Sequence, residues 1–76
     1  MKELIEVLAK SLVDNPDQVF VTEKIDGEVI FLELKVADSD MGKVIGKRGR
    51  IAKALRTVLK AAANKDRKKA MLEIVG

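Results

Sequence analysis

Residues 45–51 form the stretch of this chain whose residue types and spacing suggest a binding chemistry. Gly46 and Gly49 stand three positions apart, and glycine lets a backbone turn sharply and come close to another molecule. Lys47 and Arg48, between the two glycines, are both cationic. The first backbone N–H groups of a helix have no partner inside the helix and suit an anionic group. A tight loop, two cations and the start of a following helix together predict a site for the phosphates of a polyanion.

Two glycines at this spacing carry little weight by themselves, because a chain of this length contains about 0.3–0.4 such pairs by chance. The alternative is an ordinary helix–turn–helix, in which Gly46 ends one helix and Gly49 eases close packing. The cations and apolar residues that flank the glycines favour the binding loop.

The distribution of charge supports the same interpretation. The net charge is only +3, but residues 43–69 hold eleven Lys or Arg and a single acid, Asp66. The rest of the chain holds four bases and eleven acids. This asymmetry predicts a surface that faces a polyanion, built by the second half of the chain. The alternative is a solvated, lysine-rich helix face.

Composition limits the class of protein. The 76 residues, of which 47% are hydrophobic and 36% charged, predict one small globular domain. The absence of Cys predicts a reducing, cytoplasmic location without disulfides. We expect no membrane association, because no apolar run approaches the ~18 residues that span a bilayer. With no His, Cys or Tyr as nucleophile or base, we expect no catalysis, and the absence of His and Cys excludes zinc modules. Asp38 and Asp40 could suggest a cation site, but two acids at a helix start are more often caps, so we expect no metal or cofactor.

The first half of the chain predicts one helix and a hairpin. Apolar residues at helical spacing predict a helix over residues 2–13. Residues 19–25 and 28–36 read as strands around Asp26-Gly27, a strong signal for a two-residue turn. That turn would place Val21 opposite Leu32. One sheet face would then carry Val19, Val21, Ile30, Leu32, Leu34 and Val36, and the other Phe20, Thr22, Val29, Phe31 and Glu33.

The second half predicts two helices and a strand. Asp38, Ser39 and Asp40 would cap a short helix over residues 39–45. A longer helix would run from the glycine loop to about Ala63, with apolar residues on one side and Arg50, Lys53, Arg56 and Lys60 on the other. A last strand would cover residues 69–75, with Leu72 and Ile74 pointing inward. The order is α-β-β-α-α-β, an α+β fold.

Residues 40–56 resemble the central motif of the small bacterial RNA-binding proteins of the KhpA type, which consist of a single KH domain, and residues 13–16 are similar to that family as well. The resemblance implies a type II KH domain over residues 1–76, with three helices on one face of a three-stranded sheet. It further implies a loop that clamps about four backbone nucleotides of single-stranded RNA with low sequence specificity. A post-transcriptional regulator or an RNA chaperone would fit this activity.

The resemblance also assigns roles to residues. Gly46 and Gly49 would shape the loop, and Lys47 and Arg48 would meet phosphates. Apolar residues beside the loop, together with an edge of Leu55, would line a groove for bases. Many KH domains carry an apolar groove residue where this chain has Ala52, so base preference stays open. The expected RNA-binding residues are Ile45, Gly46, Lys47, Arg48, Gly49, Arg50, Ile51 and Lys53.

Two other functions stay open on the residues alone: a protein–protein adaptor that uses the basic helix, and a binder of single-stranded DNA. RNA modules that stack bases on aromatic platforms do not fit, because Phe20 and Phe31 are the only aromatic residues and lie outside the basic half. One KH unit covers few nucleotides, so the resemblance implies pairing, as a homodimer or with a larger RNA-binding protein that has its own KH module. A homodimer would use the open sheet face or the end of the long helix at residues 61–63.

Overall fold

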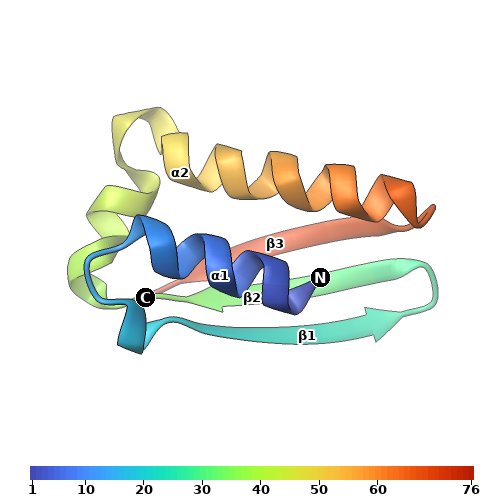
Figure 1. Ribbon diagram of the computed structural model, residues 1–76, viewed down its shortest axis with the longest axis horizontal. Coiled ribbons are helices and arrows are strands. Elements are labelled where there is room, and N and C mark those ends of the chain that lie inside the picture. Colours follow the sequence, from blue (N-terminus) through green and yellow to red (C-terminus); the bar gives the residue numbers. More distant parts are fainter.

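The computed structural model describes all of residues 1–76 and shows a small α+β fold (Figure 1). Helix α1 (Lys2–Leu12) leads through a short 3₁₀ turn, η1 (Pro16–Gln18), into strands β1 (Phe20–Asp26) and β2 (Val29–Lys35). Helix α2 (Asp38–Lys65) and strand β3 (Lys69–Val75) follow. No helix of the chain has both the length and the apolar character needed to cross a membrane.

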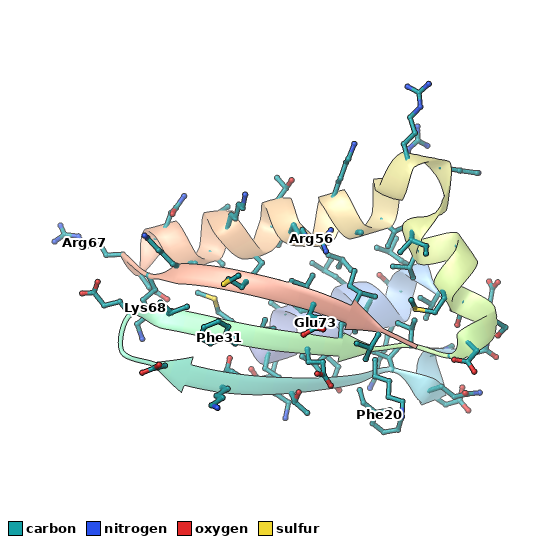
Figure 2. The ribbon with its side chains drawn as sticks, turned by 180° about the vertical axis from the view of Figure 1, so that it is seen from behind. Phe20, Phe31, Arg56, Arg67, Lys68 and Glu73 are labelled. Atoms are coloured by element: carbon teal, nitrogen blue, oxygen red, sulfur yellow. The ribbon has the colours of Figure 1, made fainter.

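The three strands form one sheet in the order β1-β2-β3. Strands β1 and β2 are antiparallel, whereas β2 and β3 are parallel. A parallel pair needs a long crossover connection, and α2 supplies it. Both α1 and α2 lie on the same face of this sheet, which leaves the other face without a covering layer (Figures 1 and 2).

The hydrophobic core lies between the helices and the covered sheet face. Its central members, Ile5 from α1, Leu34 from β2 and Leu55 and Leu59 from α2, have at most 1% of their surface exposed. The strand residues that alternate toward this core are those predicted from the sequence: Val19, Val21, Ile30, Leu32, Leu34 and Val36 are all buried. Leu72 and Ile74 of β3 are half-buried against the same core.

The predicted hairpin register was wrong by two residues. Val21 pairs with Leu34, not Leu32, and the two-residue loop consists of Gly27 and Glu28. Gly27 has a φ of +60° at the first loop position, as in a type II′ turn, whose first central residue is glycine. The predicted assignment of side chains to the two sheet faces is nevertheless correct. Side chains alternate with a period of two, so a shift of two residues returns each side chain to the same face.

The structure has two α-helices where three were predicted. The helices predicted before and after the glycine loop form one element, α2, which is kinked by four non-helical residues, 46–49. They run together because the connection is a single tight turn without an extended linker. The predicted side-chain cap at residues 38–40 was also wrong: the residue before the helix is Ala37, and no side chain caps α2.

Candidate nucleic-acid interface

The loop between the two arms of α2 has an uncommon backbone. Lys47 (φ 51°, ψ 47°), Arg48 (φ 62°, ψ 28°) and Gly49 (φ 70°, ψ 32°) all adopt the left-handed conformation. For residues with a Cβ this conformation costs roughly 1–2 kcal/mol each. Three consecutive left-handed residues change the direction of the chain within one tight turn. Lys47 and Arg48 are both exposed at this turn, which lies at one end of the molecule (yellow in Figure 1).

The two glycines of the loop differ in what they require. Gly49 has a positive φ, which favours glycine whatever the surrounding space. Gly46 has φ −71° and ψ 174°, an extended backbone that any residue adopts. A Cβ added at Gly46 would meet nothing within 4 Å. Neither backbone conformation nor packing within the chain therefore calls for glycine at position 46, and its bare backbone faces open space.

A hollow of about 350 Å³ lies beside this loop and brings four of the predicted site residues together: Gly46, Lys47, Arg50 and Ile51. Gly42 and Lys43 complete its lining and were missed as site residues. Their spacing could have indicated them, since Gly42-Lys43 precedes Gly46-Lys47 by four residues, about one helical turn. We call this the loop hollow.

The other predicted site residues lie near the loop but outside the loop hollow. Ile45 is 56% exposed, a high fraction for an isoleucine, and Arg48 and Lys53 are exposed. Gly49 is half-buried. The suggested contribution of Leu55 to a base groove was wrong, because Leu55 is buried in the core to 1% exposure.

A second concavity follows the other flank of α2. Arg56, Leu59 and Lys60 of the helix face Ala70, Met71 and Leu72 of β3 across a groove of about 210 Å³. Arg56 lies on α2 beside β3 in Figure 2. The groove combines an apolar floor with two cations, and we call it the helix–strand groove. No sequence pattern indicated this groove, since it depends on how α2 packs over β3.

One buried carboxylate connects the N-terminal segment to the arm of α2 that precedes the loop. Asp40 is 1% exposed. Its Oδ1 accepts the backbone N–H of Asp14 at 3.1 Å, and its Oδ2 accepts the backbone N–H and the side-chain Nδ2 of Asn15 at 3.0 and 3.1 Å. Lys43 Nζ donates to Asp14 Oδ1 at 3.1 Å, across the same junction. The sequence could not show this link, because 25 residues separate Asn15 from Asp40.

The charge state of Asp40 follows from these contacts. Burial by itself would raise the pKa of Asp40, but the hydrogen bonds from Asn15 and Asp14, together with the positive charge of Lys43, lower the pKa below its ordinary value of 3.8. Asp40 is therefore ionised at neutral pH and holds the segment at residues 14–15 against α2. No group of three or more acidic, His or Cys side chains is arranged to hold a metal ion.

A helical arm, a two-glycine loop with two cations and a second helical arm, set between parallel strands, define a KH-type module. The family model described as "KhpA/KhpB, KH domain" matches residues 2–74. The chain belongs to this family.

Curated relatives agree along the whole chain. A protein of Clostridium perfringens called "RNA-binding protein KhpA" is 64% identical over 75 residues, 99% of this chain and 100% of that protein. Proteins of the same name from Clostridium acetobutylicum and Aquifex aeolicus are 63% and 53% identical, with 99% of this chain and 100% and 95% of the relatives covered. No solved structure matches the chain.

Proposed function

We propose that this protein is a non-catalytic binder of single-stranded RNA whose loop at residues 46–49 clamps the sugar–phosphate backbone over about four nucleotides. The observation that carries the proposal is Gly46. Its backbone conformation and its empty surroundings would both accept a side chain, so glycine there serves the approach of something outside the chain. The names of the relatives, which are RNA-binding proteins, support RNA as that partner.

In this proposal the cations and the groove have separate roles. Lys47 and Arg48 meet phosphates at the exposed turn, and Arg50 extends the positive field around the loop hollow. Lys43 also lines the loop hollow, with its charge paired to Asp14. Contacts to phosphates position a nucleic acid without reading its sequence. The bases would lie against Ile45, Ile51 and the apolar floor of the helix–strand groove, beside Lys53. Shallow apolar contacts without a dedicated hydrogen-bonding set predict low sequence specificity.

The proposal extends to the whole chain. It treats residues 1–76 as one type II KH domain, in which the two arms of α2 count as the second and third helices. A cytoplasmic role as post-transcriptional regulator or RNA chaperone would follow from weak, sequence-tolerant binding. A short footprint gives limited affinity, so we include pairing with a second KH module, either a second copy or a larger KH protein. Of the residues suggested for a helix-mediated dimer, Ala63 is buried in the core, which leaves Ala61 and Ala62 for that contact.

The test is a fluorescence anisotropy titration of the protein into a labelled octauridylate RNA between about 50 and 200 mM salt. If about three phosphates are neutralised, log K falls against log salt with a slope near −2, at ~0.7 per phosphate of a single strand. The affinity then drops roughly 15- to 20-fold over this range. An affinity that does not change with salt concentration would contradict the clamp and favour the alternative function as a protein–protein adaptor. Stronger binding of the matching DNA oligonucleotide would assign the site to single-stranded DNA instead.

A further inference from the structure

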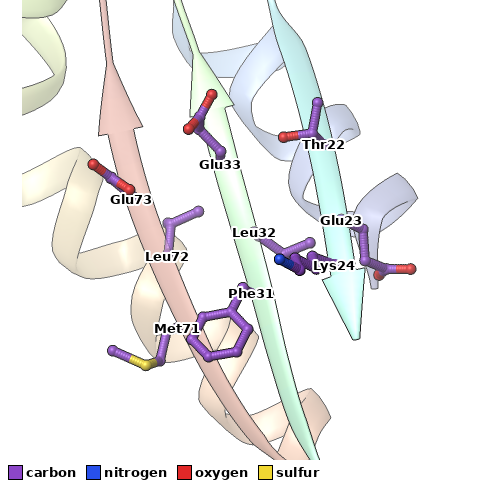
Figure 3. A pocket seen from close by; sticks show the side chains of 9 residues that line it. All are labelled: Thr22, Glu23, Lys24, Phe31, Leu32, Glu33, Met71, Leu72 and Glu73. Carbon is purple, nitrogen blue, oxygen red and sulfur yellow. The ribbon is translucent and has the colours of Figure 1, made fainter. Parts of the chain in front are cut away.

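The largest hollow of the molecule lies on the sheet face that no helix covers. It has a volume of about 480 Å³ and extends across all three strands (Figure 3). Phe31 and Met71, which are 40% and 59% exposed, lie side by side within it. The full lining is Thr22, Glu23, Lys24, Phe31, Leu32, Glu33, Met71, Leu72 and Glu73. We call it the sheet-face hollow.

Strand register places two carboxylates next to each other in this hollow. Glu33 of β2 pairs with Glu73 of β3, and both side chains project from the open face (Figure 3). Like charges at paired positions of a sheet are unfavourable. The ion pairs of the chain are formed elsewhere, by the N-terminus and by Lys10 and Lys43. Glu33 and Glu73 therefore form a carboxylate pair without a cation in the free protein.

The charge of the sheet-face hollow sets it apart from the rest of the surface. Its lining has three glutamates and one lysine. Glu23 pairs with the core residue Leu32 and so projects from the helix side of the sheet, which leaves Glu33, Glu73 and Lys24 on the open face, a net charge of −1. The loop hollow and the helix–strand groove are lined by cations without any acid. RNA phosphates would be repelled from a negative hollow. A second copy of this chain presents the same negative hollow, so face-to-face pairing about a two-fold axis would bring like charges together.

We propose that the sheet-face hollow docks a partner protein through a segment that presents an arginine or lysine between apolar side chains. The cation would lie between Glu33 and Glu73 and relieve their repulsion, and a guanidinium can bind carboxylates with two parallel hydrogen bonds. Phe31 and Met71 supply the apolar contact on one side, and the Phe31 ring offers a face for the cation. The protein would then hold RNA at the loop and a protein partner on the opposite layer, with both sites occupied together.

Peptides test the proposal directly. The probe is a blocked hexapeptide of alternating leucine and arginine, titrated into the ¹⁵N-labelled full chain and followed by NMR, with a leucine–glutamate hexapeptide as the charge control. Backbone shifts should concentrate on residues 22–24, 31–33 and 71–73 for the arginine peptide and stay absent for the glutamate peptide. Shifts spread over all acidic surfaces, or absent from these segments, would overturn the proposal.

A matched pair of variants distinguishes the effect of the Glu33/Glu73 pair from the effect of net charge. Glu33→Gln with Glu73→Gln removes the carboxylate pair at nearly constant shape, whereas Asp17→Asn with Glu28→Gln removes two exposed acids elsewhere. The first variant should bind the arginine peptide about fivefold more weakly, since each exposed charge pair contributes modestly, and the second should bind it as the parent does. Circular dichroism checks that both remain folded.

Two further measurements decide between occupants. The octauridylate RNA should shift the loop residues and leave 31–33 and 71–73 unchanged; RNA shifts on the sheet face would overturn the proposal. The Glu33/Glu73 variant should sediment as the parent does. A change in its association state would mean that a second copy covers this face, which would also overturn the proposal.

Discussion

Two glycine-containing turns lie at opposite ends of the long axis of the molecule (Figure 1). They differ in which residues adopt the left-handed backbone conformation. The hairpin turn has one left-handed residue, and that residue is Gly27. The loop in α2 has three, and two of them are Lys47 and Arg48. The hairpin turn thus follows local backbone preference, whereas the loop departs from it at two successive positions.

Under the proposed function, this difference marks the place where RNA binding outweighs local backbone stability. Glycines at positions 47 and 48 would fit the left-handed backbone without steric cost, but they would carry no charge. A strained backbone persists only where the surrounding structure holds it and where something is gained. Here the gain is two cations at the tip of an exposed turn. The hairpin turn, which connects two paired strands, has no such requirement.

The largest effect should come from reversing the loop charges. Lys47→Asp with Arg48→Asp should weaken RNA binding by about 100-fold or more, because each reversal replaces an attraction of about 1 kcal/mol at 4 Å in water by a similar repulsion. Asp tolerates the left-handed conformation better than most residues, so the melting temperature should stay nearly unchanged. Fluorescence anisotropy and thermal circular dichroism measure the two quantities.

Lys24→Glu with Lys35→Glu provides the control, because it changes the net charge equally on the sheet face away from the loop. That variant should keep most of its RNA affinity. Equal losses in both variants would show that net charge, and not the strained loop, governs binding, and the comparison between the two turns would lose its functional meaning.

The two loop glycines should separate binding from folding. Gly46→Ala places a methyl group in open space and should leave stability unchanged, but it should weaken RNA binding about tenfold, as expected for a methyl group forced into a close contact. Gly49→Ala should lower the free energy of unfolding by about 1 kcal/mol, because alanine strains the left-handed backbone. If Gly46→Ala binds RNA as the parent does, the RNA backbone does not approach position 46.

Introducing a glycine in the loop and removing the glycine of the hairpin turn should change the free energy of unfolding in opposite directions. Arg48→Gly should raise the free energy of unfolding by about 0.5–1 kcal/mol, since relief of left-handed strain exceeds the entropic cost of glycine, while RNA affinity falls. Gly27→Ala should lower the free energy of unfolding by about 1 kcal/mol and leave RNA affinity unchanged. Chemical denaturation measures both. Destabilisation by Arg48→Gly would mean that the arginine side chain contributes contacts that outweigh the strain.

Sequence patterns predicted those parts of the structure that depend on neighbours along the chain. The alternation in β1 and β2 placed Val21 and Leu32 in the core, and helical spacing placed the apolar side of the long helix there. The hairpin register failed because Asp26-Gly27 and Gly27-Glu28 are both acceptable two-residue turns and both keep the sheet faces. The RNA-binding roles assigned to residues 45–51 and to Lys53 remain predictions. The structure shows only that these residues lie in and around the loop. The helix–strand groove and the contacts of Asp40 depend on tertiary packing, which no local pattern encodes.

Asp40 provides the last and smallest expected effect, because it acts on the loop only through the arm of α2 that precedes it. Its folded-state pKa lies below the ordinary value of 3.8, so its ionised form stabilises the native state. This contribution is fully present above about pH 4 and is lost as the pH falls through the lowered pKa.

Thermal melts from pH 7 to pH 2.5 should therefore show Asp40→Asn less stable than the parent at pH 7, with the gap closing below pH 4. Asp38→Asn, at an exposed position of the same helix, is the control for the loss of one negative charge. A stability gap that stayed constant down to pH 2.5 would show that the shape of Asp40, and not its charge, holds residues 14–15 against α2. The hairpin turn needs no such distant contact, because strand pairing fixes both of its ends.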